Sequence, residues 1–138
     1  MYGFLGLFAK PPAQDPLSPL AWLEALVDKS QLGPDPIKTL GAGWRGVFFE
    51  EGSLMNNPGL YAVIDSRPFS TGSRLLDIGE SAQIRDRIKH HERRPCWEGH
   101  SSGQLGFATW YLPDSTDQQR RNHESFFRWQ FGPVCGVR

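Results

Sequence analysis

The sequence is poor in cysteine and has no excess of charge of either sign. Cys96 and Cys135 are its only cysteines, which is too few for the disulfide framework of a small secreted domain. The 15 Lys and Arg residues are balanced by 15 Asp and Glu residues, so no overall field draws the protein to nucleic acid or to an anionic membrane. We therefore expect a cytoplasmic protein whose binding, if it binds a polyanion, uses a local basic patch.

Long apolar runs, internal repeats and low-complexity tracts are also missing. Residues 1–9 are apolar but too few to cross a bilayer, and Lys10, Pro11 and Pro12 follow them directly. We expect no membrane association. The content of 38% hydrophobic and 12% aromatic residues is ordinary for a globular protein, and 138 residues suffice for one hydrophobic core.

The first third of the chain predicts one helix and little else. Ser18 and Pro19 are suited to cap and start a helix that runs to about Asp28. The Gly-Pro-Asp-Pro segment at residues 33–36 ends it, and no clear period follows until Val47. We interpret residues 1–45 as an N-terminal extension, through which a protein partner could dock, and residues 46–138 as the main domain.

The rest of the chain shows clearer periodicity. Residues 59–65 and 74–78 predict two strands joined as a hairpin, and residues 104–112 predict a third strand. One helix is expected to begin near Ser81, and another to span residues 116–131 before Gly132 and Pro133. The predicted fold class is α/β (α+β), with a small three-stranded, mainly antiparallel sheet flanked by helices.

Within the helix after Ser81, charged residues divide between two faces. Arg87 and His91 share one face with Ile84 and Ile88, at positions i, i+3, i+4 and i+7. An arginine on the apolar side of a helix is not explained by solubility. Arg87 and His91 are therefore the first candidates for a functional site.

These residues belong to an ordered series that resembles the GIY-YIG nuclease superfamily. The series is Gly59-Leu60-Tyr61, then Ile78-Gly79-Glu80-Ser81, then Arg87 and His91, then Glu124 in the last helix. The resemblance covers residues 46–136 and implies an active site made of Tyr61, Arg87, His91 and Glu124. Asp77 stands where the family usually has a second tyrosine, and Gly136 stands where many members have asparagine.

The chemistry of phosphodiester hydrolysis gives each residue a role. Glu124 would hold Mg²⁺ or Mn²⁺, because these hard ions prefer oxygen ligands and keep several waters. Arg87 can donate two hydrogen bonds to the phosphate in a fork. Tyr61 would be the general base if Arg87 or the metal lowers its pKa from about 10. His91 would orient or relay the proton, and His90 would do so if the helix phase differs by one residue.

Several alternatives remain open from the residues alone. Asp77 could support the metal, hydrogen-bond to Tyr61, or simply pair with a surface arginine. The segment from Arg85 to Arg94 has five basic residues against two acidic ones; it is either a phosphate-binding patch or a solvated helix face. We take Arg85, Lys89 and His90 as candidate substrate contacts.

A zinc site can also be argued from the sequence, but only weakly. Cys96 and His100 are four positions apart, and Cys135 and other histidines lie elsewhere, yet the usual paired ligand spacings are missing.

The resulting hypothesis is a metal-dependent endonuclease that acts on DNA rather than RNA. Its main rival is a catalytically silent relative that binds nucleic acid or protein, because a fold can persist without its activity. A third hypothesis places the domain in a toxin or host-defence system.

Overall fold

The computed structural model describes residues 28–67 and 72–136, and a five-stranded antiparallel sheet lies at its centre. The strand order is β1-β4-β3-β5-β2. The strands are β1 (Gln31–Gly33), β2 (Arg45–Phe48), β3 (Gly59–Ser66), β4 (Ser73–Ser81) and β5 (Gln104–Tyr111). The helices of the described region are α2 (Pro36–Leu40), α3 (Ile84–Lys89), α4 (Arg94–His100) and α5 (Asp117–Phe131), with a short 3₁₀ turn, η1, at Glu51–Ser53. The fold is α+β.

The prediction of three strands is wrong, because two short edge strands complete the sheet. β1 pairs with β4, and β2 pairs with β5 through an irregular register. Strands of three and four residues with irregular pairing carry almost no alternation, so a pattern-based reading misses them. β1 lies within the stretch expected to be an extension, and β2 spans the limit drawn at residue 45. The N-terminal helix expected at residues 18–28 lies outside the described residues except for Asp28.

The three long strands follow the sequence prediction closely. β3 and β4 form the expected hairpin, with Tyr61 opposite Gly79, and β3 pairs along its other edge with all of β5. The last helix also begins where expected. The side chain of Thr116 caps it by accepting from the backbone N–H of Gln119, whose side chain accepts from the N–H of Thr116 in return.

The single helix expected after Ser81 is instead two short helices. α3 ends at Lys89, and α4 begins at Arg94 with Pro95 in its first turn, a position that proline favours because it needs no backbone N–H partner there. His91 therefore lies in the turn between the helices. It is nevertheless buried beneath them, as its place on the apolar face predicted.

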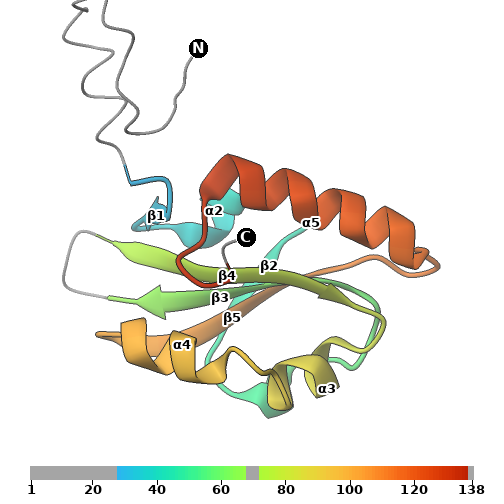
Figure 1. Cartoon of the computed structure of the whole chain (residues 1–138), viewed down its shortest axis with the longest axis horizontal. Coiled ribbons are helices and arrows are strands. Elements are labelled where there is room, and N and C mark those ends of the chain that lie inside the picture. The colour runs from blue at the N-terminus through green and yellow to red at the C-terminus, as the bar shows by residue number, and fades with distance from the viewer. Residues whose placement is uncertain (1–27, 68–71, 137–138) are drawn as a thin grey trace, which may run out of the picture.

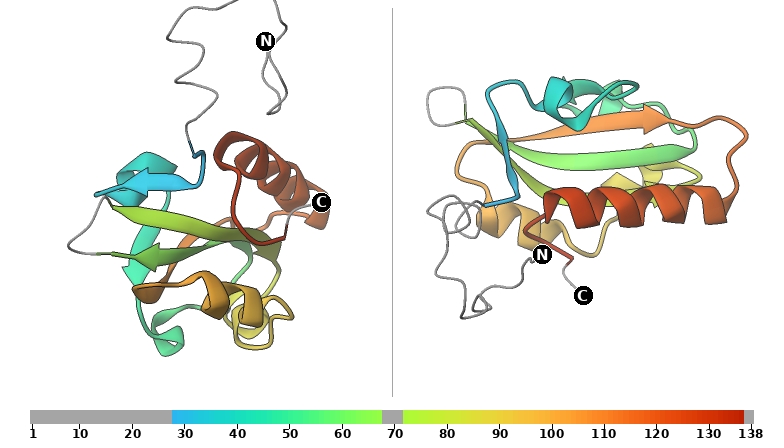
Figure 2. Two further views of the ribbon diagram at one scale, coloured as in Figure 1. Left: turned by 60° about the vertical axis from the view of Figure 1, so that its left-hand side comes forward. Right: turned by 90° about the horizontal axis from the view of Figure 1, so that it is seen from above.

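Helices cover both faces of the sheet (Figure 1). α5 and α2 lie on one side, and α3 and α4 lie on the other, an arrangement that the two further views also show (Figure 2). Alternate side chains of β3 therefore enter two separate cores. Leu60 and Ile64 pack with Phe127 of α5, whereas Tyr61 packs with Ile88 and other residues of the α3–α4 side.

Candidate active site around Tyr61

Tyr61 is held in place by a glycine on the neighbouring strand. The two residues lie opposite each other in the β3–β4 pair, and a Cβ atom added to Gly79 would lie 2.2 Å from Tyr61 Oη. No side chain at position 79 could occupy that space. The absence of a side chain thus lets the tyrosine ring cross over β4, and only 1% of Tyr61 remains exposed.

The hydroxyl of Tyr61 meets the imidazole of His91. His91 Nε2 lies 2.7 Å from Tyr61 Oη, and the backbone N–H of Arg93 donates to His91 Nδ1 at 3.0 Å. Nδ1 must therefore be unprotonated, and the single proton of a neutral imidazole is on Nε2. His91 accordingly donates to Tyr61 rather than accepting its proton.

The pKa values of the pair agree with this assignment. Burial lowers the pKa of His91 from 6.5 to about 4, and the positive charges of Arg87 and Arg93 add to the effect, so the ring is neutral at pH 7. Burial also raises the pKa of Tyr61, with a further contribution from the charge of Asp77. Arg87 and Arg93 oppose that rise.

Arg87 lies beside Tyr61 and forms a forked ion pair with Glu92. Its Nη1 and Nη2 atoms donate to the two carboxylate oxygens of Glu92 at 2.8 and 2.9 Å. This pair is the main cause of the raised Arg87 pKa, to which the nearby Tyr61 also contributes. The same pair lowers the pKa of Glu92 to about 2. The two Nη atoms of Arg87 are thus arranged to donate to a pair of oxygens, and in this structure those oxygens belong to Glu92.

Asp77 is a fully buried carboxylate surrounded by donors. Its Oδ2 accepts from Arg93 Nε at 2.7 Å and from Trp97 Nε1 at 2.8 Å. Its Oδ1 accepts from Arg93 Nη2, Arg128 Nη2 and the backbone N–H of Ile78. Five hydrogen bonds fill the lone pairs of a carboxylate. Asp77 pairs with arginines, as one of its alternatives held, but inside the protein rather than at its surface.

Glu124 reaches the site from the other side of the sheet. It lies on α5, is largely buried, and accepts from Arg128 Nε at 3.3 Å. Its charge is close enough to Tyr61 to raise the pKa of the tyrosine. Arg128 itself bridges α5 to the edge of β4 and to the segment after α5, because it also donates to Ile78, Cys135 and Gly136 carbonyls.

Each of the three carboxylates of the site is paired with an arginine. The guanidinium groups of Arg87, Arg93 and Arg128 face the carboxylates of Glu92, Asp77 and Glu124. Glu124, the metal ligand expected from the sequence, is also engaged by an arginine, so a Mg²⁺ or Mn²⁺ ion there would compete with its ion pair to Arg128. Within the described ranges, no group of three or more His, Cys, Asp or Glu residues gathers around it.

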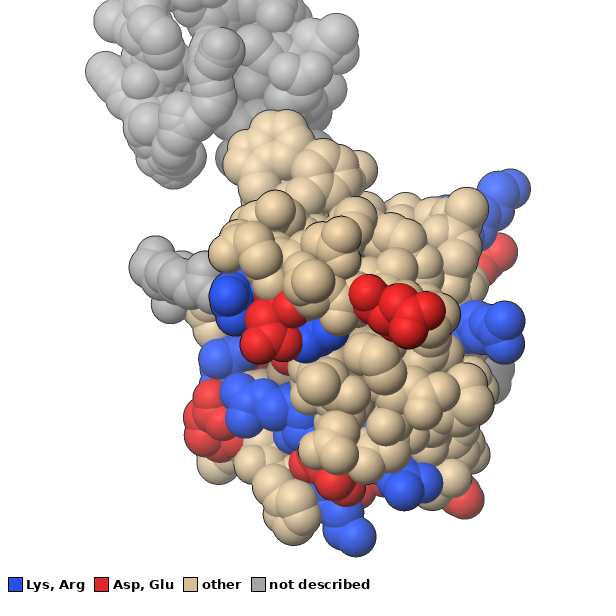
Figure 3. All heavy atoms as spheres, turned by 90° about the vertical axis from the view of Figure 1, so that its right-hand side faces the viewer, with Lys and Arg blue, Asp and Glu red and all other residues tan. Residues whose placement is uncertain are grey.

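The candidate substrate contacts lie at the rim on α3. Arg85, Lys89 and His90 are exposed, and Arg85 Nη1 donates weakly to the Leu54 carbonyl at 3.5 Å. Of the five basic residues between Arg85 and Arg94, three are ion-paired, namely Arg87, Arg93 and Arg94. Basic and acidic groups also alternate over the face in Figure 3, so the local positive excess is smaller than the sequence suggests.

The sequence analysis missed the residues that bind Asp77. Arg93 was counted only among the basic residues of a patch, and neither Arg128 nor Trp97 was connected with Asp77. Of these residues, only Arg128 could have been found from the sequence, because Glu124 and Arg128 have the i, i+4 spacing of a helical ion pair.

Comparison with known proteins identifies no relative. No protein-family model matches the chain, and no curated protein or solved structure is significantly similar to it. Membership of the GIY-YIG superfamily therefore stays a prediction. In the part of the chain that the structure describes, no helix is long and apolar enough to cross a membrane.

Proposed function

We propose that the protein is a metal-dependent nuclease of GIY-YIG type that hydrolyses phosphodiester bonds. The observation that supports this best is the environment of Tyr61 Oη, which lies 2.7 Å from His91 Nε2 and close to the positive charges of Arg87 and Arg93. The hydrogen bond from His91 and the two nearby positive charges favour negative charge on this phenolic oxygen.

In this proposal Tyr61 takes the proton from the attacking water. Burial works against its ionisation, and the positive charges of Arg87 and Arg93 partly offset that cost. A divalent ion at Glu124 would lower the pKa of its bound water and polarise the phosphate. Arg87 would exchange Glu92 for the phosphate oxygens, where its fork stabilises the charge that develops in the transition state.

The other residues act as positioning groups. His91 is fixed by the backbone N–H of Arg93, so it holds Tyr61 in one orientation. Asp77 neutralises and orients Arg93 and Arg128. Arg85, Lys89 and His90 are placed to contact the backbone of the substrate beyond the scissile bond. We propose DNA as the substrate and the cytoplasm as the location, as the sequence led us to expect.

A silent binding module is the second candidate, and three observations favour it. Arg87 is already occupied by Glu92, and Asp77 is occupied by arginines where the family usually has tyrosine. In addition, a surface hollow lined by Arg45, Met55, Trp110 and other residues includes none of the proposed catalytic residues. Such a module would bind a phosphate backbone without cutting it.

Cleavage of supercoiled plasmid and of labelled single- and double-stranded oligonucleotides separates the two functions. The reactions contain Mg²⁺, Mn²⁺ or a chelator, and compare wild type with Arg87→Ala and Glu124→Gln. Removal of a transition-state donor typically lowers turnover by about 10²- to 10³-fold, and we expect losses of that order in both variants.

Two matched variants control for charge. Arg121→Ala and Glu98→Gln remove the same charges from exposed helix positions and are expected to cut like wild type. If all five proteins show the same background cutting with and without metal, the nuclease hypothesis fails and the silent binding module takes its place.

A further inference from the structure

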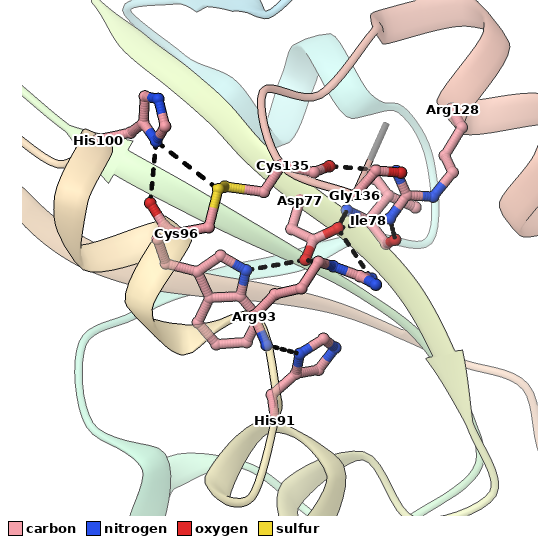
Figure 4. The surroundings of a disulfide bond; sticks show 10 residues. Asp77, Ile78, His91, Arg93, Cys96, His100, Arg128, Cys135 and Gly136 are labelled. Carbon is pink, nitrogen blue, oxygen red and sulfur yellow. Dashed lines mark hydrogen bonds and ion pairs between the residues drawn. A yellow bond between two sulfur atoms is a disulfide. The ribbon is translucent and has the colours of Figure 1, made fainter. Parts of the chain in front are cut away.

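Two cysteines and a histidine converge where α4 meets the segment that follows α5. Cys96 and His100 lie one helical turn apart, and Cys135 follows α5 in the chain. A disulfide joins Cys96 to Cys135, a bridge that the sequence analysis did not predict. The three ligand atoms lie within 4.8 Å of one another, and Figure 4 shows the imidazole of His100 turned towards the sulfur atoms.

The distances fit tetrahedral zinc coordination. Zinc bonds of about 2.3 Å to sulfur and 2.0–2.1 Å to nitrogen place a sulfur and a nitrogen ligand about 3.6 Å apart, and two sulfur ligands about 3.8 Å apart. His100 Nδ1 lies 3.6 Å from Cys96 Sγ. This distance is already that of a zinc site, and Zn²⁺ would replace the proton that Nδ1 now donates to the Cys96 carbonyl at 3.0 Å. The two sulfur atoms would reach theirs by side-chain rotation once the bond between them is broken.

The protein backbone holds the three residues in place independently of the disulfide. Cys135 N–H donates to the Leu76 carbonyl at 2.7 Å, and Val134 N–H donates to the Leu75 carbonyl at 3.3 Å. Cys96 and His100 are on a single helix, which Trp97 fastens to Asp77 through its indole N–H. Breaking the bond between the sulfurs therefore leaves the ligand set assembled.

We propose that the reduced protein binds one Zn²⁺ through Cys96 Sγ, Cys135 Sγ and His100 Nδ1, with water as the fourth ligand. A dithiol reductant supplies two electrons and two protons, becomes a disulfide itself, and leaves Cys96 and Cys135 as thiols. Zn²⁺ then displaces both thiol protons as it binds. The same pair of cysteines thus carries a disulfide under oxidising conditions and a metal under reducing ones.

This site is separate from the proposed nuclease chemistry in ligands and in metal. Glu124 would take a hard ion through oxygen, whereas thiolate and imidazole ligands select Zn²⁺. The two sites are nevertheless connected, because Cys96 precedes Trp97 and Cys135 precedes Gly136 along the chain. The Trp97 indole binds Asp77, and the Gly136 carbonyl accepts from Arg128. Either cross-link holds together the two segments that surround Asp77.

The test uses the full-length protein, reduced with a phosphine under argon and freed of metal. Zn²⁺ is titrated in competition with a chromophoric chelator, and Co²⁺ is titrated in parallel because its absorption reports thiolate ligands and tetrahedral geometry. We expect one ion per chain in the reduced protein. We expect at least tenfold weaker binding in His100→Ala and in the oxidised protein, and unchanged binding in His123→Ala, which removes an exposed histidine from α5.

Circular dichroism of the same samples distinguishes loss of fold from loss of ligand. His100 is exposed, so His100→Ala should fold as wild type does. The proposal is wrong if the reduced wild-type protein binds Zn²⁺ no more tightly than reduced His100→Ala, whether or not the protein is folded. So does equal binding by the oxidised protein. Nuclease activity does not enter this experiment, so failure of the proposed function would not affect its outcome.

Discussion

His91 donates a hydrogen bond from Nε2 to Oη of Tyr61 across 2.7 Å, and both residues are almost fully buried. The bond joins the turn between α3 and α4 to the central strand β3. Because the backbone N–H of Arg93 donates to Nδ1, protonation of the ring would break this arrangement. The pair is thus a structural constraint as well as the proposed core of the active site.

Stability should fall as the pH drops from 6.5 towards 4. The pKa of His91 is lowered from 6.5 to about 4 in the folded state. Between these values the unfolded chain binds a proton that the folded protein does not, so the free energy of unfolding rises with pH. The contribution of His91 is at most about 3 kcal/mol. Urea unfolding followed from pH 4 to pH 7 measures it.

His91→Gln isolates this contribution, since glutamine can donate to Tyr61 but does not titrate. We expect a shallower pH dependence in this variant, together with lower stability at pH 7. His123→Gln should keep the wild-type slope, because His123 is exposed. Identical slopes for wild type and His91→Gln would show that His91 titrates normally in the folded protein.

Gly79→Ala should displace Tyr61. The added Cβ would lie 2.2 Å from Oη and 2.3 Å from the ring carbon that carries it, so the tyrosine must move. Overpacking of this kind costs about 1–3 kcal/mol, and we expect that loss in urea unfolding. In Gly99→Ala, by contrast, the added Cβ meets nothing within 4 Å, and alanine should stabilise the helix by up to about 1 kcal/mol. Equal effects of the two substitutions would mean that Tyr61 has room to adjust.

The strongest sequence signals were those with regular periods. β3, β5 and α5 were predicted to within one residue at each end, because strand patterns and helix stop signals are local properties of the chain. β4 was located but made too short, since it continues three residues beyond the expected end at Ile78. The edge strands β1 and β2 were missed because their short segments are defined by pairing with β4 and β5. Pairing between distant segments leaves no trace in a local pattern.

Only the part of the candidate site that comes from one stretch of sequence could be predicted from residue spacing. The sequence spacing of Arg87 and His91 indicated a common site, although His91 lies in the turn after α3 rather than on a continued helix. The partners of Asp77 come from the α3–α4 turn, from α4 and from α5, and only the folded structure brings these together. The same holds for the approach of Cys135 to Cys96, which lie 39 residues apart.

Asp77→Asn should destabilise the protein strongly. The carboxylate is fully buried, and its removal leaves the guanidinium groups of Arg93 and Arg128 without their counter-charge. Breaking a buried ion pair from one side costs about 3–5 kcal/mol, and urea unfolding at pH 7 measures the loss. Asp114→Asn is the control, because Asp114 is exposed at positive φ, where asparagine is well tolerated. If Asp77 instead supported a metal, Asp77→Asn would weaken metal binding and leave stability nearly unchanged.

Glu92→Gln should release Arg87 for binding to phosphate. The Glu92 side chain is 62% exposed, so its ion pair with Arg87 contributes at most about 1 kcal/mol and the variant should remain as stable as wild type. With its carboxylate competitor neutralised, Arg87 should bind a phosphodiester about two- to fivefold more tightly. Fluorescence anisotropy of a labelled oligonucleotide at low salt, with chelator present to prevent cleavage, measures the affinity. Glu98→Gln makes the same change in net charge at a side chain that is 64% exposed and lies 3.9 Å from Arg94. A gain confined to Glu92→Gln assigns the phosphate contact to Arg87, whereas an equal gain in both variants reflects net charge alone and removes Arg87 from the proposed site.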